Sequence, residues 1–488
     1  MADLLDTIDA TGHLYPGRIA HVSGAETLTW GNLVRRSDAL AGGLSRMTTR
    51  GAPVVLRGHK EPEMLIGFLG CAKAGISYVP IDDSVPEARA KRIIAAAGAE
   101  LVLTPTSIRR LEEEQHAPPA RSAHASTPLY VMFTSGSTGE PKGVVITRGC
   151  LDAFLGWMLQ EQQFAPHEEV FLNQAIFSFD LSVMDTWCSL ATGGTVVSLR
   201  SDDLADFKKM FAVLQGSALT TWVSTPAFAQ LCLAEPHFTS AMLPRIRRFL
   251  FCGDVLAPGV ARQLIERFPS AQVWNTYGPT EATVATSSVR VDEQIIESYP
   301  QVPVGVAMLG TQINIEDERG QPVPPGERGE IVIVGPNVST GYLGREDLTQ
   351  RVFSRRNGER AYRTGDIGSV QDGLLFFHGR MDSQVKIAGY RIELGDIESH
   401  LASLPNVRAA VVVAALRDGR PDSLHAFVCL VERPAVSELE IGRVLRLELA
   451  ALTPAYMLPR KFHVLEAFPL TENGKTDRQE LTRRASGE

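Results

Sequence analysis

The sequence lacks the usual signs of a secreted, membrane-spanning or nucleic-acid-binding protein. Its six cysteines lie far apart, without a CxxC pair or zinc-like spacing, so we expect reduced and mostly buried thiols. No apolar run approaches the length of a membrane span, and the N-terminal stretch has no basic-then-apolar signal pattern. Aromatic residues make up 7%, and a net charge of −8 opposes a polyanionic partner. We therefore expect a cytoplasmic protein without a transmembrane segment and with no nucleic-acid partner.

The composition is that of a folded protein of enzyme size. Hydrophobic residues make up 44% and charged residues 21%, which is ordinary globular usage. A chain of 488 residues exceeds the size at which one hydrophobic core stops growing. We therefore expect at least two domains.

Strand-like and helix-like segments alternate through most of the chain. Strand-like PVVLRG is followed by helix-like EPEMLIGFLGCAKAG, strand-like YVPI, helix-like PEARAKRIIAAAG and strand-like AELVLT. This alternation predicts parallel sheets with helices packed on them, and it recurs to about residue 376. The last hundred residues instead predict a small α+β domain. We expect a large N-terminal α/β body (1–379), in which helices flank the sheets, a hinge (380–383) and a small, mobile C-terminal domain (384–488).

The stretch FTSGSTGEPKGVV combines glycines and hydroxyl residues with one lysine. Successive backbone N–H groups in such a turn form a concave nest that suits phosphate oxygens, and the lysine adds a positive charge. Apolar segments precede and follow it, so it is expected to join two strands, whereas a Walker loop leads into a helix. Composition alone leaves two interpretations open, which are a phosphate-binding loop and a flexible surface hairpin.

Six blocks of sequence together resemble the adenylate-forming superfamily. In chain order they are FTSGSTGEPKGV, SFDLSVMD, NTYGPTEATV, YRTGDIG, GRMDSQVKIAGYRIELGDIE and TENGKTDR. The segments SFDLSVMD, RFLFCGDVL, VARQLIERFP and NTYGPTEATVA most resemble the bacterial ligases that attach D-alanine to a carrier protein. That resemblance implies ATP and Mg²⁺ as cofactors, and D-alanine and a carrier protein bearing phosphopantetheine as partners.

The resemblance also implies which residues bind the nucleotide. Tyr277 is expected to stack on adenine, Asp366 to bind the ribose hydroxyls, and Glu281 to be the magnesium ligand, since a carboxylate beside phosphate suits this ion. Arg380, at the expected hinge, is expected to reach the nucleotide. The implied nucleotide-binding set is Thr134, Ser135, Gly136, Ser137, Thr138, Gly139, Lys142, Asn275, Thr276, Tyr277, Gly278, Pro279, Thr280, Asp366, Arg380 and Lys475.

Lys475, in NGKTD, is implied as the catalytic residue. The substrate carboxylate and the α-phosphate repel each other, and one ammonium group between them stabilises the charge that develops. In the superfamily this lysine comes from the small domain, which then rotates and presents the segment Ala388 to Tyr390 to the incoming thiol. The chain has no LGGxS carrier motif and no HHxxxD condensation motif. A free-standing enzyme that acts on a separate carrier is expected.

Asp180 is implied as the partner of the substrate ammonium group, which favours an amino acid over a fatty acid. A buried unpaired carboxylate is costly, and an arginine near Asp180 is the alternative partner. Mid-sized apolar groups are expected around the substrate side chain, and the bulk of Cys252 is expected to select one enantiomer. The implied pocket is Leu181, Met184, Val223, Leu250, Cys252, Thr276 and Val284. The alternative is an enzyme that loads L-alanine, glycine, L-serine or L-proline.

Overall fold

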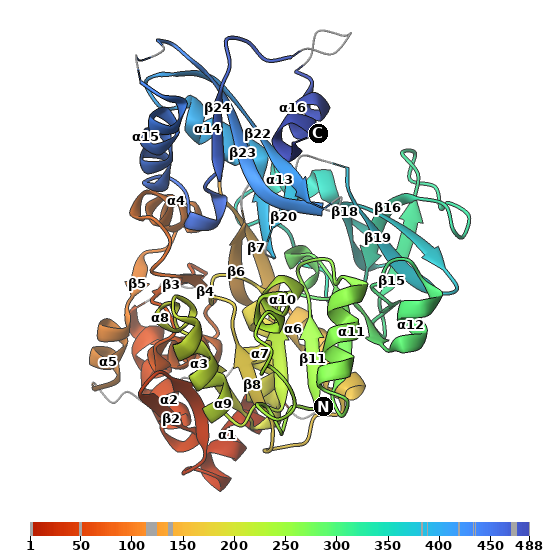
Figure 1. The fold of residues 1–488 in the computed structure, drawn as a ribbon. Coiled ribbons are helices and arrows are strands. Elements are labelled where there is room, and N and C mark those ends of the chain that lie inside the picture. The colour runs from red at the N-terminus through yellow and green to blue at the C-terminus, as the bar shows by residue number, and fades with distance from the viewer. Residues whose placement is uncertain are drawn as a thin grey trace. The chain divides into compact units, whose positions relative to one another are not determined.

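A computed structural model gives the fold of the chain (Figure 1). The structure describes residues 3–47, 51–113, 124–134, 140–381, 384–387, 389–417, 420–432, 434, 436–469 and 476–487. The chain forms two compact units. The first contains residues 1–82, 97–132 and 143–381, and the second contains residues 83–96, 133–142 and 382–488.

Nine strands of the described residues form the largest sheet of the first unit. Its centre, from β12 to β1, is entirely parallel, and antiparallel strands close both edges. Short apolar strands buried on both faces are typical of such a centre. In spatial order the strands are β14 (Val306–Ala307), β13 (Ser287–Val291), β12 (Gln272–Tyr277), β11 (Arg248–Phe251), β10 (Thr221–Ser224), β8 (Val170–Asn173), β9 (Thr195–Ser198), β1 (Ile19–Ser23) and β2 (Glu26–Thr29).

A second sheet, which belongs to the first unit except for residues 133, 134 and 142, is built from the alternating segments near the N-terminus. Its order is β5 (Leu101–Leu103), β3 (Val54–Arg57), β4 (Tyr78–Ile81), β6 (Pro128–Thr134) and β7 (Lys142–Thr147). The pairs β3–β5, β3–β4 and β4–β6 are parallel, which confirms the predicted α/β alternation. The glycine-rich stretch lies between β6 and β7, and it joins two strands as expected.

Helices cover these sheets. The group α2, α3 and α5 packs beside β3, β4 and β5 (Figure 1). Pro62 starts α3 at a position where its missing N–H costs nothing, and Gly75 ends this helix in the left-handed conformation. The helices of the first unit are α1 (Leu4–Leu14), α2 (Trp30–Met47), α3 (Pro62–Ala74), α5 (Pro105–Glu113), α6 (Arg148–Gln162), α7 (Leu181–Thr192), α8 (Ser201–Leu204), α9 (Phe207–Gly216), α10 (Pro226–Leu233), α11 (Pro258–Arg267), η1 (Thr280–Ala282), α12 (Glu293–Ser298) and α13 (Glu346–Val352).

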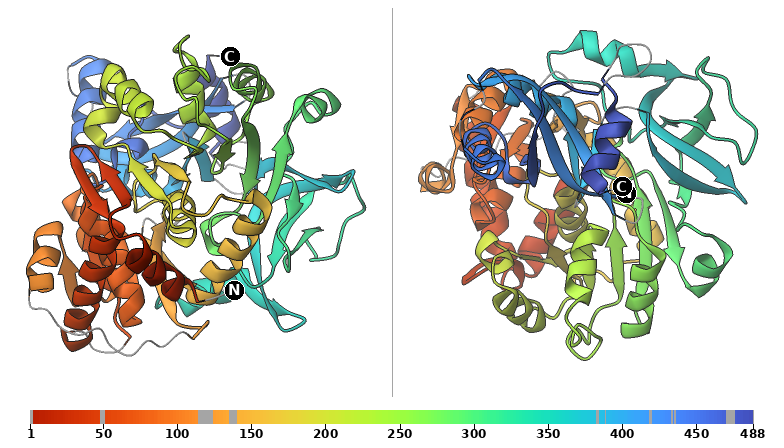
Figure 2. Two further views of the ribbon diagram at one scale, coloured as in Figure 1. Left: turned by 90° about the horizontal axis from the view of Figure 1, so that it is seen from below. Right: turned by 45° about the horizontal axis from the view of Figure 1, so that its top comes forward.

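The last part of the first unit is an antiparallel sheet, drawn in green-cyan to blue in Figure 2. Its strands are β15 (Gln312–Glu316), β16 (Gly329–Val334), β18 (Glu359–Gln371), β17 (Phe353–Arg356) and β19 (Leu374–Arg380). The alternation of strands and helices predicted only parallel sheet, so this antiparallel sheet was not expected. Its short turns contain Gly358 and Gly373, both at positive φ. Such turns join antiparallel neighbours without a crossover helix.

The second unit is a small α+β structure. The helix α4 (Glu87–Ala97) belongs to it although it comes early in the chain, and Arg89 forms a buried ion pair of 3.1 Å with Asp396. Its other elements are β20 (Gln384–Ile387), β21 (Tyr390–Glu393), α14 (Leu394–Ala402), β22 (Val407–Arg417), β23 (Arg420–Leu430), α15 (Glu438–Ala450), η2 (Ala455–Met457), β24 (Lys461–Val464) and α16 (Arg478–Ser486). The limits 1–379, 380–383 and 384–488 stay a prediction.

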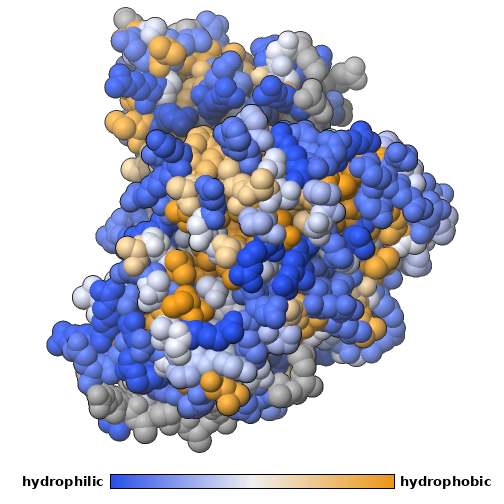
Figure 3. All heavy atoms as spheres, turned by 60° about the horizontal axis from the view of Figure 1, so that its bottom comes forward, coloured by the Kyte–Doolittle hydropathy of each residue, from blue (hydrophilic) through white to orange (hydrophobic). Residues whose placement is uncertain are grey.

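The hydropathy of the helices, the surface hydropathy and the state of the cysteines can be compared with the expectations from the sequence. Within the described ranges, no helix is both long and apolar enough to cross a membrane. On the face drawn in Figure 3, hydrophobic residues form small groups between hydrophilic ones. All six cysteines are free and buried, as predicted.

Candidate active site

Four of the predicted substrate residues lie near the ends of parallel strands of the large sheet. Val223 of β10 pairs in register with Leu250 of β11. Cys252 follows the end of β11, and Thr276 lies near the end of β12, where its hydroxyl donates to the carbonyl of Phe251 at 2.8 Å. Ligands of open α/β sheets bind at the carboxyl ends of the strands. The topology therefore brings these residues to the edge where a ligand is expected.

Tyr277, Asp366 and Arg380 form one hydrogen-bonded group. The Tyr277 hydroxyl donates to Asp366 Oδ2 at 2.5 Å, and the Arg380 guanidinium donates to Asp366 Oδ1. Asp366 and Arg380 are opposite each other on β18 and β19. Burial, together with the Asp366 carboxylate, raises the pKa of Tyr277 well above its usual value. Tyr277 therefore stays protonated and acts as a donor.

A bulge in β18 aims Asp366 toward this group. The pairing of β16 with β18 shifts register between Glu330 and Val332, so β18 contains extra residues there. Gly365, next to Asp366, has φ of 71°, a conformation that glycine adopts without a steric penalty. Bulges re-aim side chains at functional sites. Without the bulge, Asp366 would follow the regular alternation of the strand.

Glu281 lies in η1, directly after β12, and is completely buried. Its Oε1 accepts a hydrogen bond of 2.8 Å from the hydroxyl of Tyr342, and its backbone carbonyl accepts one of 2.8 Å from the N–H of Ser339. A carboxylate oxygen is a ligand that suits Mg²⁺, which is usually bound by one or two carboxylates together with phosphates and water. The residue present therefore fits a magnesium ion.

The backbone after Glu281 is strained. Thr283 and Val284 have φ of 56° and 68°, a left-handed region that β-branched residues rarely adopt. Asn337 holds this turn, because its side-chain amide donates to the carbonyl of Ala282 at 2.8 Å and its backbone carbonyl accepts from the Thr283 hydroxyl at 2.7 Å. Strain of this kind persists only where the surroundings enforce it, and it is concentrated at functional sites.

Val284 and Cys252, two of the residues predicted to line the substrate pocket, contact each other. The Cys252 thiol lies 3.5 Å from the backbone carbonyl of Val284, within the range of a weak hydrogen bond. Both side chains are nearly inaccessible to solvent, with exposed fractions of 3% and 2%. The left-handed turn at Val284 therefore determines which atoms face Cys252.

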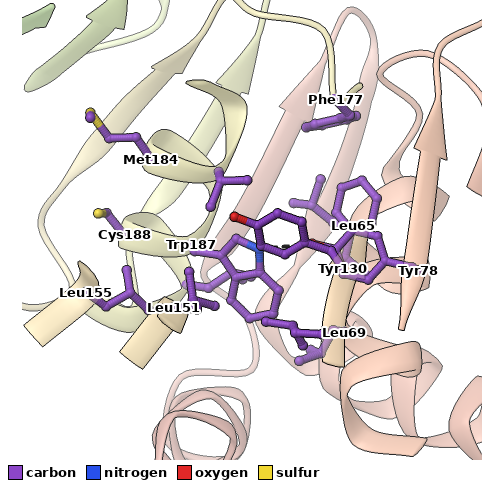
Figure 4. Close-up of a cluster of buried hydrophobic side chains, with 14 of the residues drawn as sticks. Leu65, Leu69, Tyr78, Tyr130, Leu151, Leu155, Phe177, Met184, Trp187 and Cys188 are labelled. Carbon is purple, nitrogen blue, oxygen red and sulfur yellow. Dashed lines mark hydrogen bonds between the residues drawn. The ribbon is translucent and has the colours of Figure 1, made fainter. Parts of the chain in front are cut away.

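Asp180 directly precedes α7. Its side chain makes no capping hydrogen bond with the helix, and 8% of the residue is exposed. Leu181 and Met184, on the first turn of α7, are buried. Figure 4 shows Met184 directed away from Trp187, whose indole N–H donates to the Tyr78 hydroxyl at 3.1 Å. This contact fastens α7 to β4 of the neighbouring sheet.

The glycine-rich loop and the catalytic lysine are described only in part. Thr134 ends β6, and its buried hydroxyl has no hydrogen-bond partner among the described residues. Lys142 begins β7. The remaining predicted residues, Ser135, Gly136, Ser137, Thr138, Gly139 and Lys475, lie outside the described residues, as does Ala388.

The other predicted residues lie on or after β12. Asn275 donates from its side-chain amide to the carbonyl of Pro303 at 2.8 Å, and Gly278, Pro279 and Thr280 connect β12 to Glu281. Gly278 approaches the chain so closely that an added Cβ would lie 2.6 Å from the Cα of Ala285. A glycine is therefore required there.

Sequence reasoning missed the residues that hold this site. Tyr342 donates a hydrogen bond to Glu281, and Asn337 holds the turn at Thr283. Neither residue belongs to one of the six motifs. No local signal marks them, because their partners are 61 and 54 residues away. The hydrogen bond from Tyr277 to Asp366 was likewise not expected.

Two family descriptions match this chain. The AMP-binding enzyme family matches residues 8–343, and the AMP-binding enzyme C-terminal domain matches residues 396–475. Proteins named D-alanine--D-alanyl carrier protein ligase, from Bacillus mycoides (strain KBAB4) and Bacillus cereus (strain B4264), are each 44% identical to this chain. Both alignments cover 98% of this chain and 98% of the relative.

Solved structures with the same fold include adenylation domains. The Vibrio cholerae adenylation domain AlmE, in complex with glycyl-adenosine-5'-phosphate, has a TM-score of 0.85 at 21% identity, covering 100% of this chain and 98% of its own. An artificially fused adenylation-PCP di-domain from Klebsiella oxytoca has a TM-score of 0.81 at 25% identity, covering 94% and 93%. The fold is therefore that of adenylation domains.

Proposed function

This chain belongs to the AMP-binding enzyme family, and on that premise we propose that it is an AMP-forming ligase that loads D-alanine onto a separate carrier protein. The observation that carries the proposal is the 44% identity to D-alanine--D-alanyl carrier protein ligases over 98% of both chains. The reaction needs ATP, so we place it in the cytoplasm. The carrier would pass D-alanine on to a cell-envelope polymer of the lipoteichoic acid type.

In the first half-reaction, a carboxylate oxygen of D-alanine attacks the α-phosphorus of ATP. The bond between the α-phosphorus and the oxygen that bridges to the β-phosphate breaks, and pyrophosphate leaves with the electron pair of that bond. We assign the β- and γ-phosphates to the loop from Thr134 to Lys142. Adenine is assigned to the face of Tyr277, and the ribose hydroxyls to Asp366. The contacts of Tyr277 and Arg380 with Asp366 support this assignment, because they fix the carboxylate in one orientation.

Glu281 is the residue proposed to hold Mg²⁺. When bound, the ion would neutralise phosphate charge. The hydrogen bond from Tyr342 orients the Glu281 carboxylate, and a residue that orients a metal ligand typically affects metal affinity. The remaining ligands would be phosphate oxygens and water.

We assign to Lys475 the stabilisation of the charge between the D-alanine carboxylate and the α-phosphate. In the second half-reaction, a phosphopantetheine thiol attacks the acyl carbon, the acyl–phosphate bond breaks, and AMP leaves. The C-terminal domain (384–488) is proposed to turn about residues 380–383 between the two steps, so that Lys475 serves the first and the segment Ala388 to Tyr390 the second.

Asp180 is the proposed partner of the D-alanine ammonium group. It directly precedes α7, and Leu181 and Met184 on the first turn of this helix are buried. The pocket would be completed by Cys252, Val284 and Thr276, which lie at the ends of β11 and β12. Small apolar walls without a second charge suit a methyl side chain.

The test is ATP–pyrophosphate exchange with purified protein. D-alanine, L-alanine, glycine, L-serine and L-proline are offered separately, and Lys475→Ala serves as the control. Exchange should be strongest with D-alanine and nearly lost in the control. If another amino acid of the panel supports faster exchange, D-alanine is the wrong substrate and the adenylation mechanism stands. If none supports exchange, the assignment of Asp180 is wrong.

A further inference from the structure

Lys60 is a lysine with no exposed surface, in a place that none of the sequence motifs marks. It lies just before α3, and its ammonium group donates to Asn173 Oδ1 and to the carbonyl of Ala175. The same ammonium nitrogen lies 4.5 Å from the centroid of the Phe177 ring, within range of a cation–π interaction. All three partners belong to residues 173–177, which run from the end of β8 toward α7.

The network continues into α7. Asn173 donates from its amide to Asp185 Oδ1 at 2.9 Å, and the Thr186 hydroxyl donates to the same oxygen at 3.0 Å. Asp185 Oδ2 has no hydrogen-bond partner within the described parts of the chain, and the residue is completely buried. The carboxylate of Asp185 therefore depends on a nearby positive charge.

Lys60 supplies that charge. Burial raises the pKa of Asp185 to about 7, although Lys60 acts to lower it. Burial lowers the pKa of Lys60 to about 8, although Asp185 and Asp82 act to raise it. Each charge thus stabilises the other at a completely buried position, and removal of one leaves a buried charge without compensation.

Asn173 also connects this network to the centre of the large sheet. Asn173 Oδ1 also accepts from the Ser198 hydroxyl on β9 at 2.8 Å, and Ser198 contacts His21 Nε2 on β1 at 2.9 Å. Nearby, His59 pairs with Asp82 at 2.7 Å. The amide of Asn173 is therefore held in one orientation, and Lys60 joins it to the N-terminus of α3.

Contacts of Lys60 and Asn173 hold the chain on both sides of Asp180. The chain is held at Ala175 and Phe177 by Lys60, and again at Asp185 through Asn173. Only residues 178–180 separate the contact at Phe177 from the start of α7. We propose that Lys60 is a positioning residue that fixes Asp180 for the ammonium group of the amino-acid substrate. This inference rests on the proposed function.

The test compares two Lys60 variants with a matched control. Lys60→Met keeps the length of the side chain without its charge, and Lys60→Met combined with Asp185→Asn removes both charges and leaves no uncompensated carboxylate. The control is Lys73→Met. Lys73 is also buried, at 2% exposure, but it pairs with Asp9 at 2.9 Å and Asp38 at 2.6 Å, on α1 and α2.

The readout is the KM for D-alanine and the KM for ATP in ATP–pyrophosphate exchange, together with Tm. Both Lys60 variants should raise the KM for D-alanine about tenfold or more and leave the KM for ATP within about twofold. The double variant should recover most of the Tm lost in Lys60→Met. Lys73→Met should lower Tm and leave both KM values unchanged.

If the KM for D-alanine of the double variant equals that of the wild type, the proposal is wrong and the role of Lys60 is purely structural. If Lys60→Met alone does not fold, the double variant carries the test. ATP–pyrophosphate exchange by the wild type with each amino acid distinguishes failure of this inference from failure of the proposed function. If the wild type accepts another amino acid, D-alanine is wrong and the KM comparison is made with that amino acid. If it accepts none, both proposals are wrong.

Discussion

The hydroxyl of Tyr277 donates a 2.5 Å hydrogen bond to Asp366, and it does so between two different sheets. Tyr277 ends β12 of the parallel sheet, whereas Asp366 lies in β18 of the antiparallel sheet. Because Arg380 donates to the other oxygen, both oxygens of Asp366 have a donor. The proposed ribose ligand is therefore oriented before the nucleotide binds.

Tyr277→Phe tests this orientation. The variant keeps the ring proposed to face adenine and loses the hydrogen bond to Asp366. Because a hydrogen bond to a charged group contributes about 1.5–3 kcal/mol, we expect the KM for ATP to rise about tenfold or more. The KM for D-alanine should not change. ATP–pyrophosphate exchange at varied ATP measures both, and an unchanged KM for ATP would contradict the role given to Tyr277.

Tyr342→Phe tests the proposed magnesium ligand indirectly. The change removes the 2.8 Å hydrogen bond to Glu281 and leaves the carboxylate in place. Loss of a residue that orients a ligand typically weakens metal binding 10–100-fold, so the Mg²⁺ concentration for half-maximal exchange should rise by about tenfold. Glu281→Gln should raise it further. If Glu281→Gln has the Mg²⁺ dependence of the wild type, Glu281 is not the ligand.

Lys475→Ala should separate the two half-reactions. Loss of a donor that stabilises transition-state charge costs about 100–1,000-fold, so exchange should fall by that factor. Transfer of D-alanine from pre-formed D-alanyl adenylate to the carrier should remain near the wild-type rate. Single-turnover transfer, followed by mass spectrometry of the carrier, measures the second step. Equal loss of both steps would show that Lys475 is not specific to adenylation.

Cys252→Ala tests selectivity between enantiomers. The thiol lies against the carbonyl of Val284, and its removal opens space of methyl size in the proposed pocket. Discrimination on that scale amounts to about 1–3 kcal/mol, so the ratio of kcat/KM for D-alanine over L-alanine should fall at least about fivefold. Cys232→Ala, at a buried cysteine on α10, is the matched control. An unchanged ratio would assign selectivity to other residues.

Glu63 should make stability depend on pH in acid. Burial acts to raise the pKa of Glu63, but hydrogen bonds from Arg109 and Arg36 outweigh it and lower the pKa to about 2. The folded-state pKa is thus below the ordinary value of 4.5. The stabilisation is therefore fully present above pH 4.5 and is lost as the pH falls toward 2.

Glu63→Gln is the corresponding variant. Its deficit in the free energy of unfolding, about 1.5–3 kcal/mol at neutral pH, should shrink between pH 4.5 and 2. Urea unfolding at several pH values measures the deficit. A deficit that is constant over this range would show that the ion pairs of Glu63 do not contribute.

The sequence by itself determined the α/β class and the family. Alternating periodicity predicted β3, α3, β4, α4 and β5 in the correct order, because hydrophobic spacing is a local property of the chain. Motifs such as NTYGPTE and YRTGD identified Tyr277, Glu281 and Asp366 as candidates, because motif residues are recognised without knowledge of their neighbours. The assignment of α4 to the second unit was not predictable in this way, because only its tertiary contacts decide it.

The tertiary structure decided which side chains hold the candidates in place. Lys60 and Asn173 are 113 residues apart, and Tyr277 and Asp366 are 89 apart, so no local pattern links either pair. Each contact depends on how one sheet or helix packs against another, and burial then makes the polar pairing obligatory, since an unpaired buried group is costly. Sequence thus identified the groups proposed to do the chemistry, and packing alone fixed their orientation and their electrostatic surroundings.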